Sequence, residues 1–295
     1  LQMAYGTSQL QSLLNRSNVH VRDPESTVAK VYRLIEGGAR SITVISDFDH
    51  TLSRSHDEEG GRCPVTHEVF GNPQRFPQIV EKFAQLEQKY ARFEHLTEGE
   101  ERIEKMEAWW SESNQVIIEQ GINRSELSDL VKETNIQLRE GAAEFMVKLE
   151  QQQIPMLIFS AGIGDIISLV LEQKLGKILA NAHVISNMMA YDEEDRICCF
   201  SDPLIHCFNK SGAMVAESSP LHSLIFARPN ILLLGDALGD ARMAEGLGKD
   251  EDRVLKIGFL NSKPEMLSHF TSAFDIVIVD DQTMEIPTEI LNMID

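Results

Sequence analysis

One mostly apolar run of the chain ends in two acidic residues and reads Ile42-Thr43-Val44-Ile45-Ser46-Asp47-Phe48-Asp49-His50-Thr51-Leu52. A short run of this kind is typical of a strand buried on both faces of a parallel sheet. Ligands of such sheets bind beyond the carboxyl ends of the strands. We therefore expect the carboxylates of Asp47 and Asp49 to face one pocket. The alternative is a capping or turn cluster, and the position directly after a buried strand argues against it.

Strand and helix signals alternate along most of the chain. Asp23-Pro24 predicts the start of a helix over about 24–37, which Gly37-Gly38 ends. A hairpin is expected around 191–195, where acidic residues supply the turn. The further strands expected are 155–159, 230–234, 254–257 and 275–279, and the further helices are 140–152 and one from about Asp165. Repeated strand and helix units predict an α/β fold with a parallel sheet covered by helices.

The composition changes between Pro73 and about Glu133. Long charged stretches there alternate with apolar residues at helical spacing, and runs of β-branched residues are rare. This pattern predicts a helical subdomain inserted into the α/β fold. Residues 1–20 are polar with little periodicity, and we expect them to form a loosely held N-terminal arm.

The chain has 295 residues and a formal net charge of −19, with a sequence pI near 4.9. A protein that grips nucleic-acid backbones needs a Lys/Arg surface to release counterions, so a nucleic-acid polymer is disfavoured as a partner. A small anionic substrate remains open, because a metal ion and a few placed cations reverse the field locally. The most apolar run, 154–171, is broken by polar residues and glycines, so we expect no membrane segment.

The cysteines Cys63, Cys198, Cys199 and Cys207 lack the paired spacing of a zinc site, and no leader of the secretory kind precedes them. We therefore expect reduced thiols and a cytoplasmic location. We further expect a monomer.

A second acidic motif follows the strand expected at 230–234 and reads Leu234-Gly235-Asp236-Ala237-Leu238-Gly239-Asp240. Its glycines let the backbone approach a ligand. Asp236 is the better metal ligand, and Asp240 would orient Asp236 or the waters of a metal. A plain helix N-cap is the alternative for Asp240.

These carboxylates suit phosphate chemistry. A carboxylate such as Asp47 can attack phosphorus and form an acyl phosphate, which splits one hard displacement into two easier ones. A second carboxyl such as Asp49 can protonate the leaving oxygen and later deprotonate the attacking water. Because two adjacent anions would repel a phosphate, a divalent cation is required, and Mg²⁺ accepts carboxylates, waters and a phosphate oxygen.

Two further segments supply groups for an anion. The strand expected at 155–159 runs into Ser160-Ala161-Gly162-Ile163-Gly164-Asp165, where a hydroxyl and backbone N–H groups at a helix start form an anion site. Ordinary turn formation is the alternative. Lys210 follows an apolar stretch and precedes a turn, so it is the lysine expected to neutralise the phosphate, although most lysines are solvated surface residues.

The four segments, in this order, resemble the motifs of the haloacid dehalogenase superfamily of phosphatases: Asp-x-Asp-x-Thr, a hydroxyl motif, a lysine, and Gly-Asp-x-x-x-Asp. Beyond these motifs the chain looks similar to the cytosolic 5′-nucleotidase III family over nearly its whole length after residue 20. The segments that carry this resemblance are 46–54, 159–165, 204–210 and 232–244, with 60–64 and 255–261 in addition.

The resemblance implies a Rossmann-like haloacid dehalogenase core, formed by 21–58 and 136–295, with a helical cap inserted at 59–135. It implies that Asp47 is the nucleophile and Asp49 the acid and base. The groups implied to hold Mg²⁺ are Asp47, the main-chain carbonyl of Asp49, and Asp236, with Asp240 behind them. The groups implied to hold the phosphate are Ser160, the N–H of Ala161, and Lys210.

The resemblance also implies that the cap closes over the nucleoside and excludes water. Glu94 and Ser113 match the positions that contact the base or substrate. Trp110 could stack on a nucleobase, and a cationic 7-methylguanine would gain roughly 0.5–2 kcal/mol of cation–π attraction. Packing in the core is the alternative for the Trp109-Trp110 pair.

The activity implied is Mg²⁺-dependent hydrolysis of nucleoside 5′-monophosphates through an aspartyl phosphate, with CMP, UMP and 7-methyl-GMP as candidate substrates. The Trp109-Trp110 pair favours the branch of the family that also takes 7-methyl-GMP. Open alternatives are a phosphatase for another small phosphomonoester, a nucleoside phosphotransferase, and a nucleotide-binding protein without turnover. Two departures from the family pattern, His50 and a shorter cap around 94–109, bear on base preference. His50 is expected to be a packed or pocket-edge histidine rather than a base.

Overall fold

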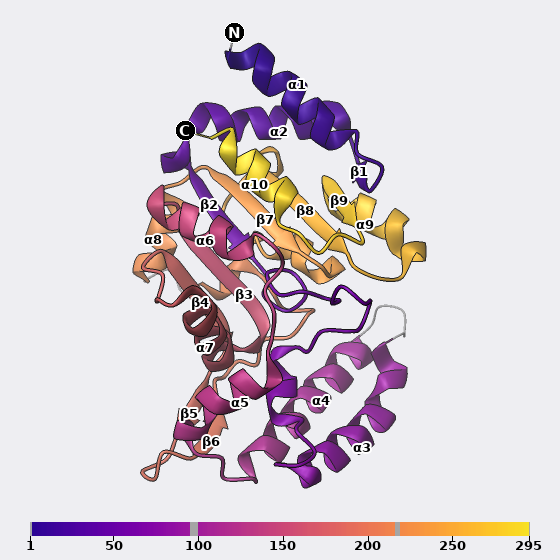
Figure 1. Cartoon of the computed structure of the whole chain (residues 1–295), viewed down its shortest axis with the longest axis vertical. Coiled ribbons are helices and arrows are strands. Elements are labelled where there is room, and N and C mark those ends of the chain that lie inside the picture. The colour runs from indigo at the N-terminus through magenta and orange to yellow at the C-terminus, as the bar shows by residue number, and fades with distance from the viewer. Residues whose placement is uncertain (1, 95–99, 216–218, 295) are drawn as a thin grey trace.

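The structure is a computed structural model that describes residues 2–94, 100–215 and 219–294 (Figure 1). The strands are β1 Val19–Val21, β2 Ile42–Ser46, β3 Met156–Ile163, β4 Ala182–Asn187, β5 Met189–Tyr191, β6 Ile197–Phe200, β7 Asn230–Gly235, β8 Val254–Leu260 and β9 Ile276–Val279. The α-helices are α1 Gln2–Leu14, α2 Pro24–Gly37, α3 Pro77–Glu94, α4 Glu100–Ile118, α5 Leu127–Thr134, α6 Ala142–Gln151, α7 Gly164–Leu175, α8 Pro220–Phe226, α9 Leu267–Ala273 and α10 Glu285–Asn292.

The main sheet is mostly parallel, as the alternation of strand and helix signals predicts. Its strand order is β1-β9-β8-β7-β2-β3-β4, and each neighbouring pair is parallel except β1 with β9. Strand β2 lies between β7 and β3, and every residue of it is buried. The predicted α/β fold is therefore confirmed, and the apolar run before Asp47 is a central strand.

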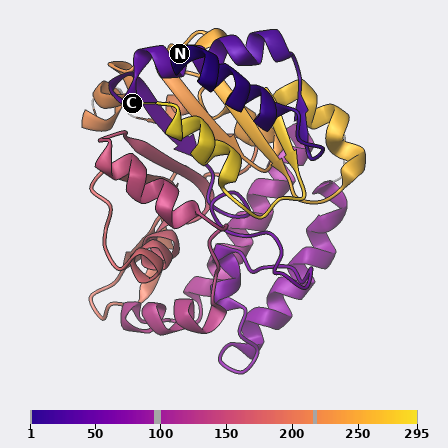
Figure 2. The same cartoon turned by 45° about the horizontal axis from the view of Figure 1, so that its top comes forward.

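Helices cover both faces of this sheet (Figures 1 and 2). On one face, buried residues of α2, α6 and α7 form a core with Ile42 and Val44. On the other face, residues of α8 and α9 pack with Ile45. Because successive side chains of a strand point to opposite faces, β2 fills both cores. This explains why the run at 42–46 shows no polar face.

Helices α3, α4 and α5, which we call the cap, follow β2 in the chain and lie away from the sheet (Figure 1). The hairpin β5–β6 lies beside them. The N–H of Ile197 donates to the carbonyl of Ile122 at 2.9 Å, and Asn123 pairs with Arg196 in an isolated bridge. The cap therefore rests on a hairpin from the second half of the chain, a contact that the local composition could not reveal.

The N-terminal segment differs from the loosely held arm that the sequence predicts. Residues 2–14 form helix α1, in which Leu10 and Leu13 are buried. Residues 19–21 form β1, which pairs with β9 at the edge of the sheet. The prediction of a loose arm is wrong because the two leucines, spaced three residues apart, suffice to pack one turn of a helix although the segment is otherwise polar.

Strand β3 is longer than predicted. It continues to Ile163, whereas the apolar run suggests an end at Phe159, and its pairing with β4 shifts between these two residues. The irregularity falls on Ser160-Ala161-Gly162, so the hydroxyl motif lies in extended backbone rather than at a helix start. Helix α7 begins directly afterwards, at Gly164.

In the part of the chain that the structure describes, no helix is both long enough and apolar enough to cross a membrane. The four cysteines are free thiols, with Cys63 buried and Cys198 and Cys199 exposed.

Candidate active site

Three neighbouring strands bring the predicted motifs to one edge of the sheet. Strand β2 lies between β7 and β3, so the carboxyl ends of these parallel strands meet. Asp47 directly follows β2 and Asp236 directly follows β7, while Ser160 lies in β3 just past the residues that pair with β2. The sheet order therefore accounts for the meeting of side chains that lie far apart in the sequence.

Lys210 lies between two of the predicted carboxylates. Its Nζ is 2.6 Å from Asp47 Oδ1 and 2.7 Å from Asp240 Oδ1, and all three side chains are buried. Burial alone would lower the pKa of Lys210, but the two carboxylates raise it above its ordinary value, so the ammonium stays charged. Burial raises the pKa of Asp47 to about 6, against the opposing effect of Lys210 and with a contribution from Asp240.

Asp49 is held by Thr66, a residue outside the predicted motifs. The Thr66 N–H donates to Asp49 Oδ1 at 3.0 Å, and the Thr66 hydroxyl donates to Oδ2 at 2.8 Å. Burial and the neighbouring Asp47 raise the pKa of Asp49 to about 7, while the bonds from Thr66 oppose the rise. A carboxyl group that titrates near neutral pH can both give and take a proton there.

Asp236 and Asp240 differ in how their oxygens are used. Asp240 Oδ2 accepts from the N–H groups of Asp236 and Ala237, each at 3.0 Å, and its Oδ1 meets Lys210. Asp236 Oδ1 accepts from the Thr51 hydroxyl at 3.2 Å. Burial and the nearby Asp47 and Asp240 raise the pKa of Asp236 well above its ordinary value. This arrangement favours Asp236 over Asp240 as a direct metal ligand.

The acidic cluster fits a divalent cation. Asp47, Asp236 and Asp240 each offer one carboxylate oxygen, and these atoms lie within 4.8 Å of one another. Burial raises the pKa values of Asp47 and Asp236 more than the positive charge of Lys210 lowers them. Hard oxygen ligands of this kind suit Mg²⁺, whose charge would make up the difference.

Ser160 and Asp49 border the same small space around Gly162. A Cβ atom at Gly162 would lie 2.8 Å from Asp49 Oδ2 and 3.1 Å from Ser160 Oγ, so a larger residue would crowd both groups. The Ser160 Oγ accepts from the N–H of Gly162 at 3.0 Å. Because a hydroxyl carries one donor besides its acceptor sites, Ser160 can still donate to a phosphate oxygen.

Asn187 connects the two segments that are predicted to hold the phosphate. Its Nδ2 donates to the carbonyls of Ala161 and Ile205, each at 2.9 Å, and its Oδ1 accepts from the Ile205 N–H at 2.8 Å. Ala161 adjoins Ser160, and Ile205 belongs to the loop that leads to Lys210. This buried amide therefore sets the distance between the hydroxyl motif and the lysine loop.

Arg139 stabilises the turn that follows Asp49. Its Nη2 donates to the carbonyl of His50 at 2.7 Å and its Nε to that of Thr51 at 2.8 Å. His50 has a φ of 61°, a left-handed conformation that costs free energy for a residue with a side chain. The side-chain amide of Asn261 also donates to the His50 carbonyl, at 3.0 Å. His50 is one of the residues that line a cavity beside Asp236, which fits one of the two positions expected for it.

Two cavities adjoin these groups. One, of about 390 Å³, contains Asp236 and lies between α4 and the loops that follow β7 and β8. The other, of about 260 Å³, lies in the cap and is lined by His67, Phe83, Glu87, Met106, Trp109, Trp110 and Ser113. Met106 lines both cavities, so this one side chain forms a wall between the cap cavity and the space beside the acidic cluster.

The cap cavity brings Trp110 and Ser113 together, two of the three residues expected to contact the base or substrate. The ring of Trp110 meets the ring of His67 edge-on at 4.4 Å. Burial lowers the pKa of His67 to about 4, so its ring is neutral, and its buried Nε2 has no partner among the described residues. Trp109 also stacks on Tyr90 at 6.1 Å, which gives it a packing role as well. Glu94 ends α3, and its side chain lies outside the described residues.

The motifs did not identify Thr66 and His67 as functional residues. Both follow the segment 60–64, which the family resemblance includes but which stops two residues short of Thr66. Thr66 begins a 3-10 helix, so its N–H points out of the first turn toward Asp49. A hydroxyl residue two positions after the segment 60–64 is a weak local signal for this contact.

Comparisons with known proteins identify the family of this chain. A model of the family described as Pyrimidine 5′-nucleotidase (UMPH-1) matches residues 50–295 and so begins directly after Asp49. A Caenorhabditis elegans protein named putative cytosolic 5′-nucleotidase 3 is 39% identical over 290 residues, which are 96% of this chain and 77% of the relative. The Xenopus laevis 7-methylguanosine phosphate-specific 5′-nucleotidase A is 35% identical over 291 residues, 96% of this chain and 97% of the relative.

Solved structures show the same fold. The crystal structure of cytosolic 5′-nucleotidase IIIB bound to cytidine superposes with a TM-score of 0.86 at 30% identity, and 96% of each chain is covered. A phosphoserine phosphatase in a substrate-bound complex superposes with a TM-score of 0.52 at 18% identity, over 86% of this chain and 98% of the other. The second likeness concerns the fold alone.

Proposed function

The chain belongs to the pyrimidine 5′-nucleotidase (UMPH-1) family, and from this premise we propose that it hydrolyses nucleoside 5′-monophosphates with Mg²⁺ through a phosphorylated Asp47. Membership makes it an enzyme of the phosphoric monoester hydrolase class. The observation that carries the proposal is the contrast between two carboxylates. Lys210 holds Asp47 at 2.6 Å, whereas Asp49 is held by Thr66 and titrates near neutral pH.

In the first step, a carboxylate oxygen of Asp47 attacks the phosphorus, and the bond from phosphorus to the 5′ oxygen of the nucleoside breaks. Asp49 gives its proton to that oxygen, and the nucleoside leaves. In the second step, water attacks the phosphorus of the aspartyl phosphate while Asp49 takes a proton from the water. The phosphorus–oxygen bond to Asp47 breaks, so its carboxylate is restored and inorganic phosphate is released.

The phosphate needs positive charge and hydrogen-bond donors. We propose that Mg²⁺ is held by Asp47, the main-chain carbonyl of Asp49, and Asp236, with Asp240 orienting the neighbouring groups. Bound Mg²⁺ supplies charge that offsets the carboxylates and the phosphate. Lys210 adds a second positive charge. The donors proposed for the phosphate oxygens are the hydroxyl of Ser160 and the N–H of Ala161, which Asn187 keeps next to the lysine loop.

The cap cavity is the proposed place of the base. Its indole rings and the carboxylate of Glu87 suit a flat ring, and a cationic ring would gain cation–π attraction of roughly 0.5–2 kcal/mol. We therefore propose that 7-methyl-GMP is accepted in addition to CMP and UMP. The names of the frog and other vertebrate relatives favour the same preference. Ser113 and Glu94 remain the proposed polar contacts of the substrate.

The division of the chain follows from this function. We propose that 21–58 and 136–295 form the catalytic core and that 59–135 form the lid, with the hairpin β5–β6 as its support. The worm relative is named as a cytosolic enzyme, which favours the same location for this chain. A monomer remains our prediction for the oligomeric state.

The deciding experiment measures inorganic phosphate released from CMP, UMP, 7-methyl-GMP, GMP, AMP and several sugar phosphates, with Mg²⁺ and with a chelator. We expect nucleotides to be preferred over sugar phosphates in kcat/KM, and we expect the release of phosphate to stop with the chelator.

Asp47→Asn should lower kcat by roughly 10³-fold or more, while Asp250→Asn, at an exposed aspartate, should leave kcat unchanged. A preference for sugar phosphates over every nucleotide would contradict the proposed substrate class. New monophosphate formed from an added nucleoside would show phosphotransfer as well.

A further inference from the structure

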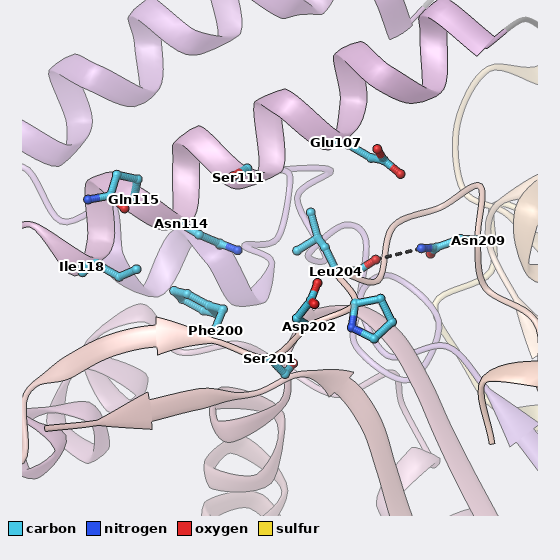
Figure 3. A pocket seen from close by; sticks show the side chains of 11 residues that line it. Glu107, Ser111, Asn114, Gln115, Ile118, Phe200, Ser201, Asp202, Leu204 and Asn209 are labelled. Carbon is cyan, nitrogen blue, oxygen red and sulfur yellow. Dashed lines mark hydrogen bonds between the residues drawn. The ribbon is translucent and has the colours of Figure 1, made fainter. Parts of the chain in front are cut away.

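The lysine loop, residues 204–210, is closed by hydrogen bonds between its own residues. Asn209 Nδ2 donates to the Leu204 carbonyl at 2.7 Å, as the dashed line in Figure 3 shows. Asn209 Oδ1 accepts from the His206 N–H at 2.7 Å, and the Asn209 N–H donates to the His206 carbonyl at 3.2 Å. Lys210 follows this turn directly and is buried. The position of its ammonium group therefore depends on the turn.

The ring of His206 adds a further bond to the same turn. Only 1% of this side chain is exposed, and its Nδ1 accepts from the Phe208 N–H at 3.3 Å. A ring nitrogen accepts a hydrogen bond only when it carries no proton. Burial lowers the pKa of His206 against the opposing effect of Glu107, so the ring is neutral. The single ring proton therefore belongs on Nε2.

Glu107 lies where that proton needs an acceptor. Its Oε1 is 3.2 Å from His206 Nε2, and the residue reaches toward the lysine loop from cap helix α4 (Figure 3). A carboxylate accepts hydrogen bonds and donates none. A ring with its proton on Nδ1 would present a lone pair to the carboxylate and an N–H group to the Phe208 N–H, so both contacts would be repulsive. The contact with Glu107 therefore selects the tautomer that the turn requires.

A second contact joins helix α4 to the same turn. The guanidinium carbon of Arg102 lies 4.4 Å from the centre of the Phe208 ring, and this ring meets that of His206 edge-on at 6.1 Å. The cap thus contacts both aromatic residues of the lysine loop. The side chain of Glu107 is 53% exposed, so its carboxylate returns to water at little cost when the cap moves away.

We propose that Glu107 is a positioning residue for Lys210, through which docking of the cap completes the phosphate site. The inference rests on the proposed function, in which Lys210 binds the phosphate and the cap is the lid. With the cap docked, Glu107 accepts from Nε2 of His206, and Nδ1 is left to accept from the Phe208 N–H. With the cap away, Nε2 loses this acceptor and the tautomer is no longer fixed, so the turn holds Lys210 less firmly.

Binding of inorganic phosphate to the full chain with saturating Mg²⁺ measures the position of Lys210 without turnover. In calorimetry, Glu107→Leu should bind phosphate about fivefold more weakly, the size of one lost hydrogen bond. Glu107→Gln, whose amide oxygen still accepts from Nε2, should stay within about twofold of the parent. Equal losses in these two variants would overturn the proposal, and so would parental affinity in a folded Glu107→Leu variant.

The matched control is Glu104→Leu, which removes the same charge from an exposed position on the same helix. Its phosphate affinity should stay within about twofold of the parent. A fivefold loss in this control as well would show that the leucine at position 107 acts through the charge or the stability of α4, and that would overturn the proposal.

Substitution of His206 tests whether the effect of Glu107 passes through the ring. In His206→Asn the side-chain oxygen can still accept from the Phe208 N–H, as in an Asx turn, but the side chain is too short to reach α4. Adding Glu107→Leu to this variant should weaken phosphate binding by less than about twofold. An undiminished fivefold loss in this background would overturn the proposal.

NMR of the ring nitrogens in histidine-labelled protein without phosphate tests the tautomer, and it does not depend on the folding of His206→Asn. We expect the proton on Nε2 of His206 in the parent, and a larger share of protonated Nδ1 in Glu107→Leu. A proton on Nδ1 in the parent would overturn the proposal even if the protein hydrolyses nucleotides. The expected tautomer in a parent that releases phosphate from no substrate would instead locate the failure in the proposed function.

Discussion

At the scale of single residues, Asp47 and Asp49 are chemically identical and have different environments. Burial raises the pKa of Asp47 to about 6, and the ammonium group of Lys210 at 2.6 Å opposes that rise and favours the charged form. Asp49 contacts neutral donors of Thr66, and its pKa is raised to about 7. A charged carboxylate suits a nucleophile, and one that titrates near neutral pH suits proton transfer. The environment therefore separates the two proposed functions of the Asp-x-Asp motif.

Thr66→Val tests this separation. Valine keeps the backbone N–H and the size of the side chain but removes the hydroxyl that donates to Asp49 at 2.8 Å. Since the bonds from Thr66 lower the pKa of Asp49, their loss should raise it further above 7. The limb of the kcat pH profile that requires deprotonated Asp49 should move to higher pH, with kcat falling about tenfold near pH 6.5. Thr66→Ser, which keeps the hydroxyl, should restore the profile; an unmoved profile in the valine variant would contradict the assignment.

The raised pKa of Asp236 makes the free energy of unfolding depend on pH. Its pKa is raised well above 3.8 in the folded protein, so this group favours folding below the unfolded pKa and opposes it as pH rises through the folded pKa. Without Mg²⁺, Asp236→Asn should therefore increase the free energy of unfolding at pH 8 by on the order of 1–3 kcal/mol. The increase in the free energy of unfolding should be smaller at pH 5, where a larger fraction of Asp236 is protonated in the parent protein. Urea denaturation with a chelator measures both values, with exposed Asp250→Asn as the neutral control. A variant less stable than the parent at pH 8 would contradict the reasoning.

At the scale of elements, local signals predicted the strands and the acidic motifs but not the residues that hold them. The residues that start the helix over 24–37, Asp23-Pro24, are its neighbours in the sequence. The strand at 42–46 is recognised by its own apolar residues. Thr66 contacts Asp49 across 17 residues, and Asn187 contacts Ala161 across 26. Neither contact can be recognised from hydrophobic periodicity or from turn residues in the sequence, because each depends on how separate elements pack in the folded chain.

Asn187→Asp tests whether the two phosphate segments must be held together. The carboxylate would face the carbonyls of Ala161 and Ile205, so two donated bonds would become repulsive contacts. We expect KM and the inhibition constant of inorganic phosphate to rise together by about tenfold or more. Asn181→Asp is the matched control, since Asn181 donates to the Ile154 carbonyl at the other end of β4. A loss of stability in both variants with phosphate affinity unchanged in Asn187→Asp would assign Asn187 a purely structural role.

Helix α4 supplies the proposed base contact, and Trp110→Leu tests it. Leucine keeps an apolar side chain beside His67 but removes the aromatic face. The KM for 7-methyl-GMP should rise about tenfold, while that for CMP should rise less, because a neutral ring gains less attraction from the indole. Trp110→Phe should recover most of the loss. Equal changes for both nucleotides would mean that Trp110 only shapes the cavity.

At the scale of the whole molecule, the N-terminal segment lies beside the C-terminal elements β9 and α10 (Figure 1). Strand β1 pairs with β9, and Arg16 donates to both carboxylate oxygens of Glu285. Gln9 Nε2 donates to Glu289 at 2.7 Å across 280 residues. The sequence predicts a loose arm here because residues 1–20 offer few apolar side chains, and their partners on α10 stand at the far end of the chain. Only the closed fold places the two leucines of α1 against an apolar surface.

Leu10→Ala measures how much this docking contributes. Leu10 is 1% exposed and belongs to the same core as β2, so its truncation should lower the free energy of unfolding by about 2–4 kcal/mol. Gln11→Ala, at an exposed position of the same helix, should change it by less than about 0.5 kcal/mol. Urea denaturation compares the two, and kcat of the folded fraction should stay unchanged because α1 lies outside the acidic cluster. If Leu10→Ala cost no more than Gln11→Ala, helix α1 would behave in solution as the loose arm that the sequence predicts.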